Sequence, residues 1–140
     1  MLYILFSDEC FVVIVYHSLS NETYSFHNLK TIQTIGFLSG LQALPKCSVR
    51  GPFLIVAPLS LVTQWESETR EWAPDVNAIV YHGSADARDF LVKNEFYYTE
   101  QFETKGRAKE LKKNHVTKFQ ILITTYEVAM KDISILSKIE

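Results

Sequence analysis

The sequence contains little cysteine, glycine or proline and no excess of charge of one sign. Two of its 140 residues are cysteines, Cys10 and Cys47, which lie 37 positions apart and form no CxxC pair. This spacing excludes a disulfide framework, argues against a zinc site and fits a reducing compartment. Five glycines and four prolines exclude collagen-like and low-complexity chains. Because the net charge is −2, any site for nucleic acid must be local.

The amino-terminal segment has two apolar runs, but neither has the length of a membrane span. Residues 2–6 and 11–15 are apolar, and the acidic residues Asp8 and Glu9 lie between them. A span needs about 20 continuous apolar residues, and a secretory signal needs basic residues before an unbroken apolar core. We therefore expect no membrane partner, and we interpret this segment as a β-strand or as a segment foreign to the rest of the fold.

From Lys30 onward, short apolar runs alternate with segments of helical periodicity. Apolar residues make up 47% of the chain, which is enough for a core at this size without disulfides or metals. The expected helices are 30–44, 60–72, 85–96 and 126–139, and the expected strands are 53–57, 78–81 and 119–124. This alternation is typical of a parallel sheet flanked by helices, so we predict an α/β fold.

Several positions in these helices have expected structural roles. Ser60 is expected to be the N-cap of the second helix, and Trp65 and Trp72 are expected to belong to its buried stripe. The acidic residues of this helix are expected to face solvent; they are Glu66, Glu68 and Glu71. Asp132 is available as a cap within the last helical segment.

The pair Lys30 and Thr31 is the one constellation that carries chemistry. At the mouth of a phosphate-binding loop, lysine binds the β/γ-phosphates and threonine binds Mg²⁺. Such a loop needs glycine before the lysine, because its backbone N–H groups point inward in conformations hostile to a Cβ. Residues 24–29 contain no glycine, and a left-handed conformation costs a residue with a Cβ about 1–2 kcal/mol. On pattern alone, the pair indicates an ordinary helix terminus at the surface.

The rest of the chain changes this interpretation. Residues 30–38, followed by Gly-Pro-Phe-Leu-Ile-Val-Ala-Pro-Leu-Ser at 51–60, resemble the SWI/SNF-type chromatin-remodelling ATPases. The stretches at 64–66, 71–74 and 121–127 are similar to the first RecA-like lobe of that family, above all of its chromodomain-helicase-DNA-binding subfamily. The resemblance covers residues 30–140 and implies part of a P-loop NTPase lobe.

The resemblance also implies a function and site residues. It implies ATP-dependent DNA translocation that slides nucleosomes in the nucleus, with ATP and Mg²⁺ as cofactors and a second ATPase lobe as a partner. Lys30 would be the phosphate ligand and Thr31 the Mg²⁺ ligand. The motifs that face DNA in the family would comprise Pro58, Leu59, Ser60, Trp65, Thr124, Thr125, Tyr126 and Glu127.

The departures from the family pattern are as informative as the match. The family has Asp-Glu-Met-Gly-Leu-Gly directly before its Lys-Thr pair, where this chain has residues 24–29. We therefore expect residues 1–29 to be foreign to the family, as an alternative start or misjoined exon, and residues 30–140 to end before the acidic Walker B box. Residues 11–15 are not expected to replace the missing first strand, so apolar sheet edges would be uncovered. Without a complete catalytic set, this chain alone is expected to be inactive.

A basic stretch at 105–118 supports an alternative function. It holds six basic residues and one acidic residue, and the basic residues are Lys105, Arg107, Lys109, Lys112, Lys113 and Lys118. Such a stretch can bind phosphates in a salt-dependent manner, or it can be the solvated face of a surface segment. The alternative to the ATPase is therefore a non-catalytic fragment that binds DNA or protein through this stretch. A third alternative is an unrelated P-loop kinase or transferase. It is disfavoured because the match of residues 58–60 and 124–127 to the remodelling family would then be a coincidence.

Overall fold

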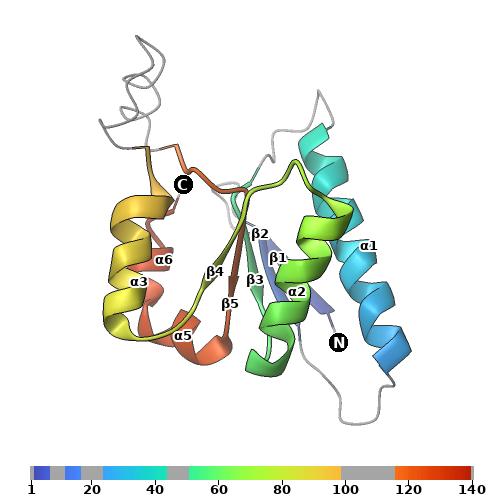
Figure 1. Cartoon of the computed structure of the whole chain (residues 1–140), viewed down its shortest axis with the longest axis horizontal. Coiled ribbons are helices and arrows are strands. Elements are labelled where there is room, and N and C mark those ends of the chain that lie inside the picture. Colours follow the sequence, from blue (N-terminus) through green and yellow to red (C-terminus); the bar gives the residue numbers. More distant parts are fainter. Residues whose placement is uncertain (1, 7–11, 17–23, 44–50, 99–115, 140) are drawn as a thin grey trace.

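The computed structural model of the chain describes residues 2–6, 12–16, 24–43, 51–98 and 116–139, and up to residue 29 it describes the backbone alone. The elements are β1 (Leu2–Phe6), β2 (Val12–Tyr16), α1 (Tyr24–Ala43), β3 (Phe53–Val56), α2 (Leu59–Trp72), β4 (Ala78–Tyr81), α3 (Ala85–Leu91), the π-helix η1 (Val92–Phe96), β5 (Ile121–Thr124), α5 (Tyr126–Lys131) and α6 (Ile133–Leu136). Figure 1 shows them as a sheet between two layers of helices.

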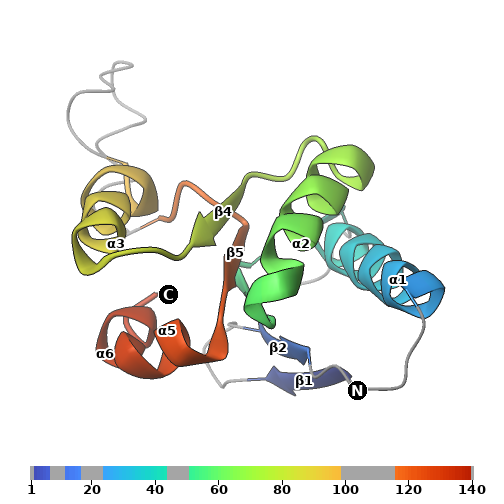
Figure 2. The same cartoon turned by 60° about the horizontal axis from the view of Figure 1, so that its bottom comes forward.

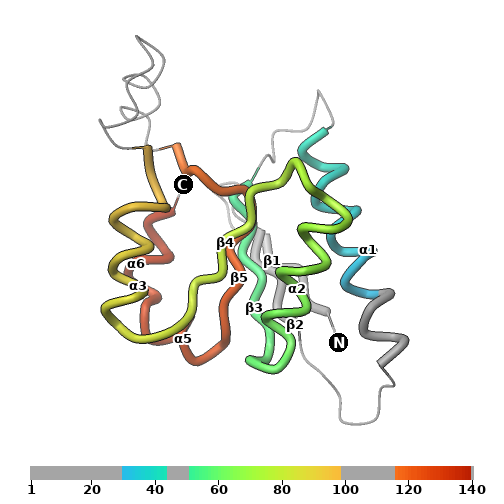
Figure 3. Tube along the Cα trace, in the orientation of Figure 1, coloured from blue at the N-terminus to red at the C-terminus, as the bar shows by residue number. Residues whose placement is uncertain are grey.

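The sheet has the strand order β1-β2-β3-β5-β4. β2, β3, β5 and β4 run parallel to one another, and β1 pairs antiparallel with β2 at one edge. Figure 3 traces the crossover from β3 through α2 to β4, which returns the chain to the amino end of the sheet. The predicted α/β fold, a parallel sheet flanked by helices, is confirmed.

The central strands are buried on both faces, which explains their continuous apolar sequences. Every residue of β3 and of β5 is buried. Because side chains alternate along a strand, Phe53 and Ile55 belong to one core and Leu54 and Val56 to the other.

Each core lies under its own layer of helices. α1 and α2 cover the first, and α3, α5 and α6 cover the second, as Figures 1 and 2 show from two directions. The first core contains Ile35, Leu38, Phe53, Ile55, Ala57, Val62, Trp65, Ala73, Ile121 and Ile123. The second contains Leu54, Val56, Tyr81, Phe96, Phe119, Leu122, Val128, Leu136 and Ile139.

The structure corrects the expected start of α2. Ser60 is not the N-cap, because the helix begins at Leu59 after Pro58, which makes no side-chain capping bond. The Leu61 N–H donates to the Pro58 carbonyl at 2.8 Å, which places the first turn ahead of Ser60. Ser60 is therefore an exposed residue of the first helical turn.

The buried stripe of α2 also differs from the expectation at its end. Trp65 is buried, but Trp72 is 56% exposed. The stripe continues from Thr69 to Ala73, four positions on, so Ala73 takes the place expected of Trp72. Glu68, expected to face solvent, is buried and accepts a hydrogen bond of 2.7 Å from the Gln64 amide.

The expectation of an uncovered sheet edge is wrong at β3. β2 pairs with β3 in parallel over four residue pairs, from Val12 opposite Phe53 to Val15 opposite Val56. A strand outside the resembled region therefore joins the sheet, and α1 begins eight residues after it, at Tyr24. Sequence reasoning missed this pairing because it judged the strand by its distance from Lys30.

Candidate nucleic-acid interface

The carboxyl ends of β3, β5 and β4 meet at one edge of the sheet. The Ala57 N–H donates to the Thr124 carbonyl at 2.9 Å, and the Thr124 Oγ1 donates to the Tyr81 carbonyl at 2.7 Å. These two bonds join three segments that are distant in sequence, namely 57–60, 81–84 and 124–127. In open α/β sheets this edge is where ligands bind. We call it the carboxyl edge.

The first predicted DNA-facing stretch is exposed at its beginning and buried further on. Leu59 is 60% exposed, Ser60 is exposed and Pro58 is partly exposed. Trp65 is 1% exposed and belongs to the core between α2 and the sheet. Only Pro58, Leu59 and Ser60 of this stretch can therefore touch a ligand, while Trp65 holds α2 against the sheet.

The second predicted DNA-facing stretch, residues 124–127, also has a buried part and an exposed part. Thr124 and Thr125 are buried, and the Thr125 hydroxyl accepts a hydrogen bond of 3.4 Å from the Val128 N–H as the N-cap of α5. Tyr126 is 65% exposed, and Glu127 is exposed as well. The two threonines thus shape the turn, and the following two residues form its surface.

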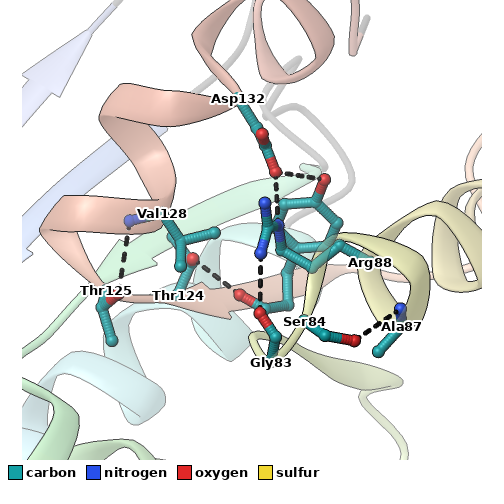
Figure 4. Close-up of polar contacts among 9 residues, drawn as sticks. Gly83, Ser84, Ala87, Arg88, Thr124, Thr125, Val128 and Asp132 are labelled. Carbon is teal, nitrogen blue, oxygen red and sulfur yellow. Dashed lines mark hydrogen bonds and ion pairs between the residues drawn. The ribbon is translucent and has the colours of Figure 1, made fainter.

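A cluster of polar side chains lies next to the carboxyl edge, between β4, α3 and the end of α5 (Figure 4). Asp132 Oδ2 accepts a hydrogen bond of 2.8 Å from the Tyr81 hydroxyl and lies 2.6 Å from Arg88 Nε. Arg88 also donates to the Gly83 carbonyl at 2.6 Å. The cluster links β4 and α3 to the junction between α5 and α6. We refer to Tyr81, Arg88 and Asp132 as the edge cluster.

The edge cluster corrects the role expected of Asp132. Its side chain does not cap α6; instead, its backbone carbonyl accepts the helical hydrogen bonds from Ile135 and Leu136. Sequence reasoning did not identify Tyr81 or Arg88, which lie 51 and 44 positions before it. Neither residue belongs to a local motif that could have revealed the pairing.

The electrostatics of the edge cluster follow from its geometry. The hydrogen bond from Arg88 holds the pKa of the Asp132 carboxyl below its usual value, with a smaller effect from Tyr81. Burial and the bond to Asp132 raise the pKa of Tyr81 to about 12. Asp132 is therefore a carboxylate and Tyr81 a neutral donor at neutral pH, which is the pairing the hydrogen bonds require.

Lys30 and Thr31, the predicted nucleotide ligands, lie inside α1. The helix begins at Tyr24, and only the first four N–H groups of a helix are free of helical bonds. Thr31 is 3% exposed, and the Lys30 carbonyl accepts a hydrogen bond of 2.8 Å from the Thr34 hydroxyl. In this arrangement the pair does not fit a phosphate and Mg²⁺ site, and we derive no catalytic step through ATP.

Most of the basic stretch, from Lys105 to Lys113, lies outside the described residues. Lys118 is described, and its Nζ donates to the Asn94 carbonyl at 2.7 Å and lies 6.0 Å from the centre of the Tyr98 ring. Tyr97 and Thr117 form an isolated antiparallel bridge at the two ends of the intervening segment.

Other features of the described residues do not resemble a site of chemistry. A hollow of about 390 Å³ lies beside the amino end of β4, away from the carboxyl edge, and its lining includes Glu66, Arg70 and Asp75. Among the described residues, no group of histidine, cysteine and acidic side chains could hold a metal ion. In that part of the chain, no helix is long and apolar enough to cross a membrane.

Comparison with known proteins shows the family. The model of the SNF2-related domain matches residues 29–140. This chain belongs to the SNF2-related family. It is 40% identical to Protein CHROMATIN REMODELING 5 of Arabidopsis thaliana, with 79% of this chain and 6% of that protein covered. The predicted family and the predicted α/β RecA-like lobe of the SNF2 domain are thereby confirmed.

Two further relatives of this SNF2-related chain are both named as helicases. It is 43% identical to the ATP-dependent DNA helicase DDM1 of Arabidopsis thaliana, with 74% of this chain and 11% of that protein covered. It is 42% identical to the human chromodomain-helicase-DNA-binding protein 6, with 79% and 4% covered. The chain thus spans only a small part of the relatives it matches.

Proposed function

We propose that this chain forms part of the first lobe of an ATP-dependent DNA translocase that remodels chromatin, and that it contacts DNA at the carboxyl edge. The observation that carries the proposal is the hydrogen bond between Ala57 and Thr124. It joins the two family motifs at one edge, where Leu59, Ser60 and Tyr126 are exposed. The names of two relatives, a chromatin-remodelling protein and an ATP-dependent DNA helicase, support the first part of the proposal.

The exposed groups suit a DNA backbone better than a base edge. The hydroxyls of Ser60 and Tyr126 can donate to phosphate oxygens, which position a protein on the duplex without reading sequence. The Tyr126 ring can also pack against sugars or exposed bases. Glu127 brings a negative charge to the same edge, so the contact would be made by hydroxyl groups and not by ion pairs at this position.

In the intact protein, ATP and Mg²⁺ would be the cofactors, and nucleosomes and a second ATPase lobe the partners, in the nucleus. The roles of Lys30 and Thr31 remain a prediction by resemblance. These two roles would require α1 to begin at Lys30, because only the first turn of a helix has backbone N–H groups free to bind a phosphate. We propose that the 140-residue chain alone does not hydrolyse ATP.

Duplex binding by the whole chain tests the proposal. Fluorescence anisotropy with a labelled duplex of about 20 base pairs would measure affinity at several salt concentrations. Tyr126→Ala should raise the Kd about fivefold, which corresponds to about 1 kcal/mol. Phe90→Ala is the matched control, since Phe90 is a 62% exposed aromatic residue on α3. Equal affinities of the Tyr126 and Phe90 variants and the unaltered chain would contradict DNA contact at the carboxyl edge.

The basic stretch gives the second candidate function, binding of DNA or protein without catalysis. Its charge of about +5 over 105–118 favours salt-dependent binding of phosphates. The double variant Lys112→Ala and Lys113→Ala should then lower duplex affinity. It should also reduce the slope of log Kd against log salt concentration by about two. If this double variant abolishes binding while Tyr126→Ala has no effect, the basic stretch and not the carboxyl edge is the DNA site.

A further inference from the structure

The helix that presents Tyr126 is too short to hold its own direction. α5 contains six residues, and isolated helices shorter than about 12–15 residues are marginal in water. Its position must therefore come from tertiary contacts. A local cap holds its start, and tertiary contacts hold its middle and its end.

The first two contacts fix the beginning and the inner face of α5. Thr125 follows β5 directly and accepts hydrogen bonds through its side chain from Val128 and through its carbonyl from Ala129. The Val128 side chain is buried in the second core. Ala129 also packs against this core, so these contacts hold the helix as far as Ala129 and leave its far end to a further contact.

The third contact holds that far end. Asp132 ends α5, where its N–H donates to the Val128 carbonyl at 3.0 Å, and it precedes α6. Its carboxylate is bonded to Tyr81 on β4 and to Arg88 on α3, and the side chains of the ion pair are only 13% and 15% exposed. A sheltered pair of this kind is less screened by salt than a surface pair.

The same cluster returns to the edge itself. The Tyr81 carbonyl accepts the Thr124 hydroxyl, and Arg88 donates to the Gly83 carbonyl in the turn after β4. The residues that hold Asp132 are therefore the residues that define the neighbouring turn of the carboxyl edge. Movement of Asp132 would therefore also displace the turn after β4.

We propose that Asp132 is a positioning residue for DNA contact, which sets the direction of α5 and hence the place of Tyr126 at the carboxyl edge. This proposal rests on the proposed DNA-binding function. Asp132 does not touch DNA itself; it acts through the short helix that it ends. Tyr81 and Arg88 are its two anchors.

The test compares Asp132→Ala and Tyr81→Phe with two control variants in the whole chain. Asp89→Asn removes an ion pair between Asp89 of α3 and Lys93 of η1, whose side chains are both more than half exposed. Ile35→Val destabilises the opposite core, far from the cluster, and controls for a general loss of stability. The readouts are duplex affinity and the exchange rates of single amide protons.

We expect Asp132→Ala to speed exchange of the Val128 and Ala129 amides about tenfold, while the Phe53 amide, bonded to Gln120 across β3 and β5, changes less. Duplex Kd should rise about fivefold, and Tyr81→Phe should produce a smaller change in the same direction. Neither control should alter the ratio of the two exchange rates. If Asp132→Ala does not fold, Tyr81→Phe decides the question with the same readouts.

Two results would overturn the proposal. One is exchange at Ala129 that rises only in step with Phe53 in Asp132→Ala or Tyr81→Phe, since a purely structural role produces that pattern. The other is faster local exchange with unchanged duplex affinity. If the unaltered chain does not bind duplex at all, the proposed function fails, and the amide ratio alone shows whether Asp132 positions α5.

Discussion

Arg88 Nε lies 2.6 Å from Asp132 Oδ2, and this ion pair joins α3 to the junction of α5 and α6. The two residues are 44 positions apart, and both side chains are largely buried. The pair connects two helices on the same face of the sheet through a single carboxylate that Tyr81 also contacts. It adds a long-range contact to the two hydrogen bonds that join the segments of the carboxyl edge.

The ion pair makes stability depend on pH. Because the pKa of Asp132 is lower in the folded chain than its ordinary value of 3.8, its stabilising contribution is complete above that value and is lost as pH falls through the folded pKa. At neutral pH, Asp132→Asn should lower the free energy of unfolding by about 1–2 kcal/mol. Urea unfolding between pH 7 and pH 2 should show this difference shrinking below about pH 4. A difference that is constant over the whole range would contradict an ionised, paired Asp132.

A side chain at Gly51 should destabilise the fold. Its φ is +93°, and a Cβ there would lie 3.2 Å from the Gln120 carbonyl oxygen. Gly51→Ala should therefore lower the free energy of unfolding by about 1–2 kcal/mol. Gly36→Ala is the matched control, since nothing lies within 4 Å of the added methyl in α1, and it should stabilise the chain by about 0.5–1 kcal/mol. Equal effects of the two changes would contradict a left-handed conformation at Gly51.

The two tryptophans should differ in their access to quenchers. Trp65 is 1% exposed and Trp72 is 56% exposed. Iodide should quench the emission of Trp72 and leave that of Trp65 almost unchanged, because a charged quencher does not enter a packed core. Trp72→Phe should remove most of the quenchable emission, whereas Trp65→Phe should leave it. The reverse pattern would show that Trp72 and not Trp65 fills the core.

ATP should not bind in the present arrangement of α1. Lys30 and Thr31 lie in the helix interior, and Thr31 is 3% exposed. Isothermal titration with millimolar Mg-ATP should show no saturable binding, and Lys30→Ala should give the same trace. Saturable binding that Lys30→Ala abolishes would establish the nucleotide role of Lys30 and require a different start for α1.

Local patterns in the sequence predicted most of the framework. The apolar runs within 53–57, 78–81 and 119–124 became the parallel strands β3, β4 and β5. The runs of β3 and β5 are apolar throughout because these two strands are buried on both faces. Their common direction also placed the stretches at 58–60 and 124–127 at one edge. The error at the start of α2 had a local cause, because Ser60 can serve either as an N-cap or as a residue of the first helical turn.

The candidate site was predictable in part. Leu59, Ser60 and Tyr126 were singled out by resemblance and are exposed at the carboxyl edge, whereas Trp65, Thr124 and Thr125 lie in the interior. A motif shows which residue types occur together, but burial depends on what packs over them. The sequence therefore could not separate the residues available for contact from those that support them.

The alternation of strands and helices, the family and the order of the motifs along the chain were readable without coordinates, because they depend on local composition and spacing. Three features required the folded chain: the pairing of Asp132 with Tyr81 and Arg88, the replacement of Trp72 by Ala73 in the buried stripe, and the pairing of β2 with β3. Each of these depends on residues far apart in the chain that meet only after the sheet has formed. Long-range pairing leaves no local pattern, which is why it had to be seen in three dimensions.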